Sequence, residues 1–225
     1  MASSRCLIGL VLLSAAGCIP YSVGTTAAPA PRRDWTRTMT TYFIPGGWEH
    51  DNDYDSAATR QRTTLFGWDL DFRYGLSESS DIGIRLPGLM GLVGTYKKRI
   101  TPDRQRGFNA AYMIGGGFIN FFQHAHVEAT LLFSAPERQD LVLYGGARVM
   151  QVIPVADSAV TDSPTAGFFL GVKIGGPHGR GTISPELGVF YDRSALGIRS
   201  RRIVFVPSIN FSGRNILRGI FGDGP

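Results

Sequence analysis

Hydrophobic and polar positions alternate along most of this chain. The stretch "GWDLDFRYGLSESSDIGIRL", residues 67–86, shows the pattern at its clearest. Bulky apolar residues occupy every second position up to Leu76, with charged residues or glycine between them, and the alternation resumes at Ile82 after the polar "SESS". A period of two places the two kinds of residue on opposite faces of a β-strand. The pattern predicts two strands joined by a turn, each with one apolar and one charged face.

The same alternation recurs in short runs from Trp35 onwards, and no long helical period appears. We expect strands over residues 36–45, 63–76, 81–87, 89–99, 108–122, 124–135, 140–154, 165–176, 181–192 and 201–212. The division at "LPGLMG" carries the weakest signal, and without it the count is nine. Single-chain outer-membrane barrels usually have an even number of strands. The pattern predicts an all-β, antiparallel, up-and-down transmembrane β-barrel of about ten strands, within a range of about eight to ten, over residues 35–213.

The lengths of the links between strands suggest how the barrel is oriented. Long links follow the first and seventh strands, and short ones follow the second, sixth and eighth, although the third and fifth links are short as well. Outer-membrane barrels have short periplasmic turns and longer extracellular loops. We therefore expect the N-terminus in the periplasm and the odd-numbered links outside the cell.

The interior volume of a barrel decides which face points inward. A barrel of about eight to ten strands has room for its side chains or for one small ligand. A soluble, lipocalin-like barrel would turn the bulky face inward, and six bulky residues from one strand would crowd that space. We therefore expect the apolar face to meet lipid and the charged face to line the lumen. The predicted lumen charge network consists of Asp69, Asp71, Arg73, Arg85, Lys97, Glu128, Arg148, Lys173 and Glu186.

These nine charges have two interpretations. Charges in a narrow, poorly hydrated lumen must pair, because an isolated buried charge is strongly penalised. Four acids and five bases are close to balance, which favours a network that plugs the barrel. The alternative is a narrow pore for small solutes or ions, in which the charges set selectivity.

Aromatic residues on the outward face suggest a membrane boundary. Five of them, from five different strands, fall at one depth near the expected periplasmic rim: Tyr74, Tyr96, Tyr112, Phe133 and Phe211. Aromatic belts occupy such interfaces in membrane proteins. The alternative is the ordinary richness of β-strands in aromatic residues.

The first residues form an export signal. Arg5 precedes an apolar run, Leu7–Leu13, which is too short for a permanent membrane helix. "SAAGC" resembles the lipobox of bacterial lipoproteins, which implies a signal peptide over 1–17 and a lipid on Cys18; the alternative is an ordinary secretory peptide cut further on, near "TTAAPA". Residues 18–34, rich in Pro, Ala and Thr, predict a flexible tether. With Cys6 in the leader, the exported chain would hold Cys18 alone and no internal disulfide.

The chain as a whole resembles small Gram-negative outer-membrane β-barrel proteins, with "RYGLSESSDIGIRL" similar to their strand–turn–strand units. The resemblance identifies no particular family. It implies the outer-membrane bilayer, lipopolysaccharide and the barrel-assembly machinery as partners. Two features depart from it. Such barrels usually end on a strand whose last residue is aromatic, whereas here Phe211 is followed by a further tail, residues 214–225. Pro185 and Pro207 also fall inside expected strands, where each removes a hydrogen-bond donor.

Candidate chemistry is sparse. His124, His126 and Glu128 alternate on one strand face and are weak candidates for a catalytic or metal site, but no nucleophile motif accompanies them. The acidic "EHDNDYD" imitates the start of a calcium loop, yet Ser56 and Arg62 replace the Gly and Glu that an EF-hand needs. That segment predicts a solvated acidic loop, with loose binding of cations or of lipopolysaccharide counterions left open. We expect no resident metal and no cofactor.

Composition narrows the class further. Charged residues make up 18% of the chain and the net charge is +5, with no basic block beyond "RSRR", so nucleic-acid binding is not expected. The sequence predicts a lipid-anchored outer-membrane barrel with a non-enzymatic role in the envelope or in surface interaction through the first and seventh loops. The alternatives are a narrow pore, an outer-membrane hydrolase or lipid-modifying enzyme, and a soluble lipocalin-like lipoprotein that binds a hydrophobic ligand. The oligomeric state is not predicted.

Overall fold

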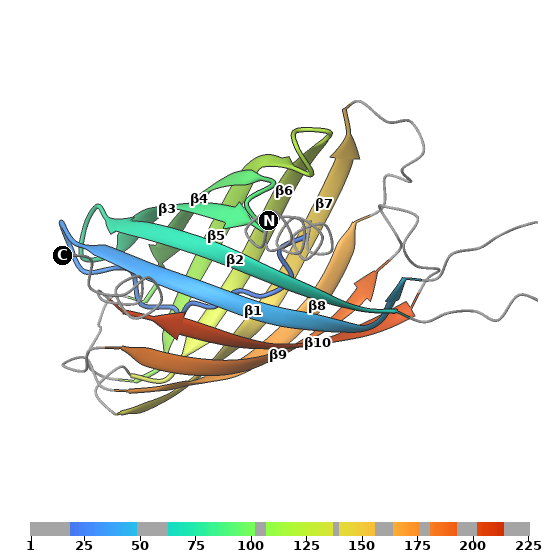
Figure 1. Ribbon diagram of the computed structural model, residues 1–225. Helices are drawn as coiled ribbons and strands as arrows, with labels where there is room; N and C mark the ends of the chain where they lie inside the picture. The colour runs from blue at the N-terminus through green and yellow to red at the C-terminus, as the bar shows by residue number, and fades with distance from the viewer. Residues whose placement is uncertain are drawn as a thin grey trace, which may run out of the picture.

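The computed structural model describes residues 19–48, 63–101, 107–136, 140–155, 164–175, 181–192 and 202–213. Within these ranges ten antiparallel strands form a closed barrel (Figure 1). The strands are β1 (Trp35–Trp48), β2 (Thr63–Gly75), β3 (Ser80–Pro87), β4 (Leu92–Arg99), β5 (Asn109–Ile119), β6 (His124–Ser134), β7 (Leu141–Pro154), β8 (Thr165–Ile174), β9 (Thr182–Asp192) and β10 (Arg202–Ser212). Among the described residues, none belongs to a helix that is long and apolar enough to cross a membrane.

The ten strands confirm the fold and the strand count predicted from the alternation. The largest differences, of three residues each, are at three strand ends. β1 continues to Trp48 rather than to residue 45, across a register shift between Ile44 and Trp48, and the other two differences are at turns. β4 begins at Leu92 rather than at residue 89, because Gly88 and Leu89 have positive φ angles of 53° and 60° that reverse the chain. β5 ends at Ile119 rather than at residue 122, because residues 120–122 all have positive φ. Two of those three residues are phenylalanines, so the apolar pattern continues through a turn that it does not reveal.

Each strand pairs with its neighbours in sequence, and β1 pairs with β10 to close the barrel. This closure consists of five residue pairs, Thr38–Tyr42 against Ser208–Ser212, and a hydrogen bond of 2.6 Å from Thr40 Oγ1 to Asn210 Oδ1 reinforces it. Pro185 and Pro207 both lie in the β9–β10 ladder, which continues through them without a shift in register. The pairing of β1 with β10 stops at Ser208, next to Pro207.

The two ends of the barrel differ in their links. We call the end that carries the Leu76–Ser79 turn, where β1 begins and β10 finishes, the turn end. The opposite end, which carries the β1–β2, β7–β8 and β9–β10 links, is the loop end. The antiparallel order places every odd-numbered link at the loop end.

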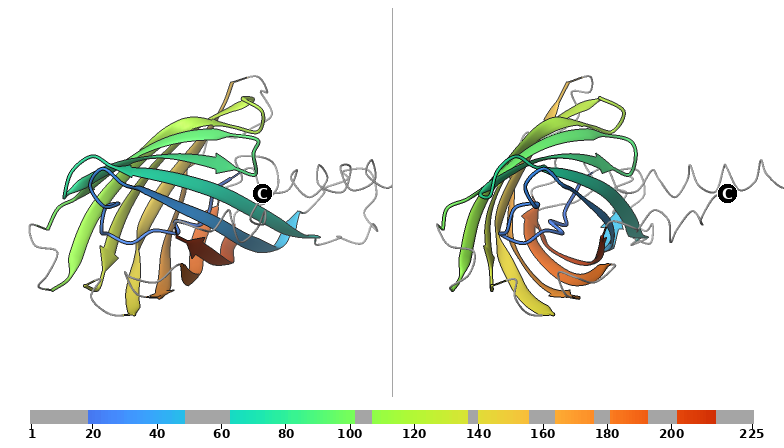
Figure 2. Two further views of the ribbon diagram at one scale, coloured as in Figure 1. Left: turned by 60° about the vertical axis from the view of Figure 1, so that its left-hand side comes forward. Right: turned by 90° about the vertical axis from the view of Figure 1, so that its left-hand side faces the viewer.

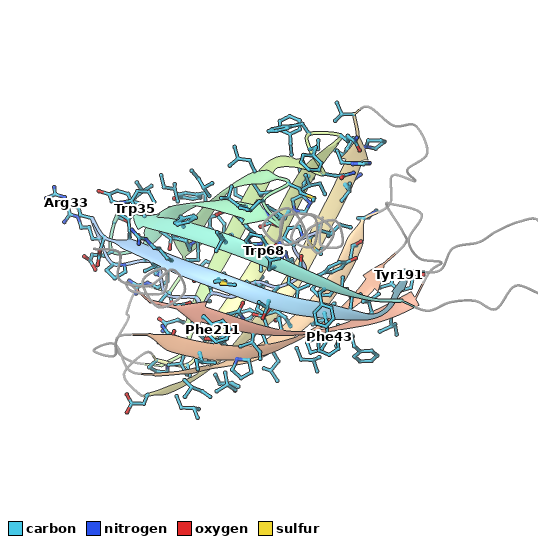
Figure 3. All side chains as sticks on the ribbon, viewed as in Figure 1. Arg33, Trp35, Phe43, Trp68, Tyr191 and Phe211 are labelled. Carbon is cyan, nitrogen blue, oxygen red and sulfur yellow. The ribbon has the colours of Figure 1, made fainter. Side chains whose placement is uncertain are left out.

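The barrel has an apolar outside and a polar inside. Large apolar side chains are exposed on the outer surface of the strands, among them Phe66 (61%), Phe168 (70%) and Ile203 (63%). Figure 3 shows labelled aromatic residues spread along this surface, from Trp35 near one end to Tyr191 near the other. Charged residues on the alternate positions are buried inside. The bulky side chains therefore face outward, opposite to the arrangement that a lipocalin-like barrel requires.

A segment of the chain occupies the lumen. Residues 19–34, called the lumenal segment below, lie inside the ring of strands when the barrel is viewed from the turn end (Figure 2, right). Tyr21, Val23, Ala27 and Ala30 are each at most 5% exposed. The composition of this segment predicts a flexible tether, whereas the structure shows it held inside the barrel.

Candidate functional site: the barrel lumen

A continuous chain of ion pairs begins near the turn end and crosses the lumen from β2 and β3 to β6 and β7. The Arg73 guanidinium, from β2, pairs with Asp81 at the start of β3, its Nε lying 2.9 Å from Asp81 Oδ1. Arg73 also contacts Asp71 at 3.5 Å, and Asp71 contacts Arg85 at 3.4 Å. The alternating charges on β2 and β3 thus compensate one another across the strand pair.

The same chain continues towards β6 and β7. Arg85 Nη1 lies 3.7 Å from Glu128 Oε1, and the other oxygen of Glu128 pairs with Arg148 and lies 3.0 Å from His126 Nε2. All four side chains are buried. Breaking one partner of such a pair would leave an uncompensated buried charge, which is costly. The network therefore ties together strands that do not all pair directly.

The cations of this chain also bind the lumenal segment. Arg148 Nη1 donates to the carbonyl oxygens of Tyr21 and Ser22, at 3.1 and 3.0 Å. Lys97 Nζ lies 3.3 Å from Asp81 and donates to the carbonyl oxygens of Thr26 and Ala28, at 3.2 and 2.8 Å. Each cation therefore connects the barrel wall to the backbone of the segment.

Glu186, on β9, lies across the ring of strands from β4 and also binds the segment. Its Oε1 accepts hydrogen bonds from Ser22 Oγ at 2.8 Å and from the backbone N–H of Val23 at 2.9 Å. Its Oε2 accepts from the backbone N–H of Gly24 at 3.0 Å and from the Tyr144 hydroxyl at 3.0 Å. Three of the four donors belong to the segment, so the segment supplies most of the hydrogen bonds that this buried carboxylate requires.

The local sequence of the segment suits this environment. A chain rich in Pro, Ala and Thr has small side chains and favours extended conformations without internal hydrogen bonds. Its buried backbone N–H and C=O groups then need partners elsewhere, since unpaired ones are costly. The lumen supplies both kinds of partner, with cations for the carbonyl oxygens and carboxylates for the N–H groups, including Asp81 Oδ2, which accepts from Ala30 N at 2.7 Å.

The lumen becomes apolar near the loop end. One buried cluster combines residues of the segment, β1, β7, β9 and β10: Tyr21, Tyr42, Ile44, Met150, Phe190, Val204 and Val206. A second consists of Val93, Ile119 and Val152, and Ile19 packs against both clusters. A third cluster, which contains Val23 and Ala27 of the segment, lies nearer the turn end. Apolar side chains and ion pairs thus fill the described part of the lumen together.

The predicted lumen residues lie where the alternation places them. Asp69, Asp71, Arg73, Arg85, Lys97, Glu128, Arg148 and Glu186 are buried, and Lys173 is half-buried near the turn end. Asp81 was missed, although it is fully buried and pairs with both Arg73 and Lys97. It shares the phase of Arg85 on β3, so the period of two contains the signal, but it is the second residue of the strand, beside the turn.

The weak catalytic candidates come together only in part. His126 and Glu128 form a buried pair, while His124 Nδ1 lies 3.4 Å from the side-chain amide of Asn120. The Glu128 carboxylate is already engaged by two guanidinium groups, so it acts as a member of the ion-pair chain rather than as a free base. Across the described ranges, no three or more His, Cys, Asp or Glu side chains are arranged to hold a metal ion.

The predicted aromatic rim faces outward towards the turn end. Tyr74 contacts Trp35 with ring centroids 5.1 Å apart, and Tyr96 contacts Tyr112 at 6.4 Å. Phe133 stacks on Phe108 at 5.6 Å, and Phe211 is 36% exposed. The assignment of this belt to a membrane boundary stays a prediction. Cys18, the acidic first loop and the tail 214–225 lie outside the described residues.

Comparisons with known proteins support the fold. An outer membrane channel from Pseudomonas putida F1 matches with a TM-score of 0.52 and 8% identity, over 85% of this chain and 99% of that chain. Neisserial surface protein A (TM-score 0.39, 9% identity, 80% and 95%) and the outer membrane protein OprG from Pseudomonas aeruginosa (0.34, 10%, 84% and 98%) also match. No family model and no curated protein matches the sequence. The chain has the fold of outer-membrane β-barrels, as its alternation predicts.

Proposed function

We propose that the protein is an outer-membrane β-barrel that its own lumenal segment keeps closed, with a non-enzymatic role in the envelope and its loop end at the cell surface. One observation carries the proposal: the charged lumen binds the backbone of residues 19–34 through Arg148, Lys97 and Glu186. These contacts come from opposite sides of the lumen, so the segment occupies the space through which a solute would pass.

The exposed apolar surface supports the membrane location. Large apolar side chains face outward from all ten strands, including Phe43, Ile84, Ile114, Val149 and Leu187. A surface of this kind is a liability in water but suits hydrocarbon, and a closed barrel leaves no unpaired strand edge in the bilayer. The partners expected from this location are lipid, lipopolysaccharide and the barrel-assembly machinery.

Single-channel recording in a planar bilayer tests closure by the segment. The full chain is compared with a variant lacking residues 19–31, and both are first checked for the shift in gel mobility on boiling in SDS that folded outer-membrane barrels show. We expect no discrete conductance steps from the full chain and regular steps from the deletion variant. Steps of equal size from both proteins would contradict closure by the segment. A folded deletion variant that never conducts would assign closure to the wall charges alone.

A gated channel is the second candidate function. The described contacts of the segment with the lumen wall include many hydrogen bonds to its backbone, which can break and form again, and the P. putida protein that shares the fold is described as a channel. Under this proposal the full chain would conduct intermittently, with open periods that lengthen when Glu186 is replaced by Ala. Steady silence from Glu186→Ala, in a barrel whose deletion variant conducts, would rule this candidate out.

A lipid on Cys18 remains part of the proposal. It is tested by mass spectrometry of the mature N-terminus, where Cys18→Ser serves as the control. A diacylglyceryl mass on the unsubstituted chain and its absence from Cys18→Ser would support the anchor. An unmodified N-terminus that begins after Cys18 would contradict it.

A further inference from the structure

The lumenal segment follows a defined path along the barrel axis. At the turn end, the N–H of Arg33 donates to Gly75 O at 2.8 Å, close to the start of β1. Moving back along the chain, Ala30 meets Asp81, the first acid on β3. Residues 25, 26 and 28 then meet Lys97 on β4. The segment is therefore fixed to the wall from its C-terminal end inward.

The path continues towards the loop end without reversing. Val23 and Gly24 bind Glu186 in the middle of β9, and Tyr21 and Ser22 bind Arg148 in the middle of β7. The carbonyl of Ile19 accepts a hydrogen bond of 3.0 Å from the Tyr42 hydroxyl. Successive residues towards the N-terminus thus lie successively nearer the loop end of the barrel.

Ile19 itself lies near the loop end. It packs against Val93, Ile119 and Val152, the apolar cluster at the loop end of the lumen. Ile119 is the last residue of β5, and Val93 is the second residue of β4.

We propose that the lumenal segment threads the N-terminus of the exported chain through the barrel and presents it at the loop end. The chain enters β1 at the turn end, yet the residues before β1 run back through the whole lumen, so the two ends of this short segment lie at opposite ends of the barrel. Because the proposed function places the loop end outside the cell, the N-terminus, with any lipid on Cys18, lies on the cell-surface side. This differs from the periplasmic N-terminus expected from the sequence, and the assignment to the surface rests on the proposed function.

Epitope tags in whole cells test this topology. One variant has a tag inserted between Cys18 and Ile19. Two reference variants have the same tag in the β7–β8 link at the loop end and in the Leu76–Ser79 turn at the turn end. Antibody binding is compared between intact and permeabilised cells, and each variant is checked for the shift in gel mobility on boiling.

The three tags separate the topology from the orientation. We expect antibody to bind the N-terminal and β7–β8 tags on intact cells, and to bind the turn tag only after permeabilisation. An N-terminal tag that follows the turn tag, while the β7–β8 tag behaves oppositely, would overturn the threading. If both loop-end tags are hidden and the turn tag is exposed, the orientation in the proposed function fails while the threading stands.

A second variant protects the test against misassembly of the tagged chain. In a Cys18→Ser chain, Ile19→Cys replaces the insertion, and labelling by a membrane-impermeant maleimide replaces the antibody. Single cysteines at Glu78 and in the β7–β8 link are the matched references. Ile19→Cys should label at least ten times faster than Glu78→Cys on intact cells, and the reverse order would overturn the threading.

Discussion

Two regions of the lumen hold their charges in different ways. Between β2, β3, β6 and β7, the residues Arg73, Arg85, Arg148 and their carboxylates form ion pairs with one another. On β9, Glu186 obtains three of its four hydrogen bonds from the lumenal segment. The ion pairs of the first region do not require the segment, whereas Glu186 depends on it. The comparison indicates that the ion-pair chain stabilises the barrel and that Glu186 retains the segment.

The largest effect should come from breaking the ion-pair chain. Arg148→Met removes a buried cation that contacts both Glu128 and the segment. We expect the free energy of unfolding to fall by about 3–5 kcal/mol, because a buried carboxylate loses its main partner. Urea unfolding in detergent micelles, followed by the shift in gel mobility, measures this loss.

A double variant is the control for that experiment. Adding Glu128→Gln removes the stranded carboxylate, so Arg148→Met with Glu128→Gln should regain part of the lost stability. A single variant within about 0.5 kcal/mol of the unmodified protein, the usual range for surface substitutions, would contradict the structural role of the chain.

Replacing Glu186 should release the segment and leave the barrel folded. Glu186→Ala removes hydrogen bonds to a charged group, at a cost of about 3 kcal/mol to segment binding. Chymotrypsin cleavage after Tyr21, which is buried in the closed barrel, should then accelerate about a hundredfold, since each 1.4 kcal/mol is a factor of ten. Cleavage at the unmodified rate, with the barrel still resistant to SDS, would remove Glu186 from the retention of the segment.

A smaller effect should follow from crowding the Tyr144 ring. A Cβ on Gly171 would overlap this ring, whose hydroxyl binds Glu186. Gly171→Ala should therefore cost about 1–3 kcal/mol, typical of overpacking, and increase cleavage after Tyr21 as well. Gly94→Ala is the matched control, because its Cβ would meet its nearest neighbour at 3.7 Å, an ordinary contact. Equal effects of the two substitutions would show that strand glycines matter for another reason.

The smallest effect is expected at Thr130. Its side chain is buried on β6, and its hydroxyl has no hydrogen-bond partner among the described residues. Thr130→Val keeps the shape and removes an unsatisfied polar group, so the free energy of unfolding should change by less than about 0.5 kcal/mol or rise slightly. A large loss of unfolding free energy would show that any substitution in the lumen destabilises the barrel. The effects at Arg148 and Glu186 would then not distinguish the two regions.

The sequence was informative about the barrel because strand faces follow a period of two. Asp71, Arg85 and Glu128 could be placed in the lumen from their phase alone, since a slip of one residue would move them into lipid. Asp81 shares that phase, and only its position beside a turn concealed it. The turn at residues 120–122 was hidden for the opposite reason, because its phenylalanines continue the apolar pattern.

The lumenal segment could not have been predicted by the same means. Its Pro, Ala and Thr residues have no period and little apolar surface, which is also the composition of a linker. Its position depends on Glu186, Arg148 and Lys97, which are 69 to 164 residues away in the chain from the residues that they bind. An excess of buried hydrogen-bonding capacity in a narrow lumen was the only available signal, and it does not identify the partner.

A designed disulfide between Ser22 and Ser208 tests the central claim most directly. The two hydroxyl oxygens lie 3.1 Å apart, one on the segment and one on β10. With both residues replaced by cysteine, we predict spontaneous cross-linking in the oxidising envelope, seen as faster migration of the boiled, non-reduced protein. Ser22→Cys with Ser134→Cys, at the turn end of β6, should not cross-link. If Ser22→Cys and Ser208→Cys form no disulfide in a barrel that still resists SDS, the segment does not occupy the lumen.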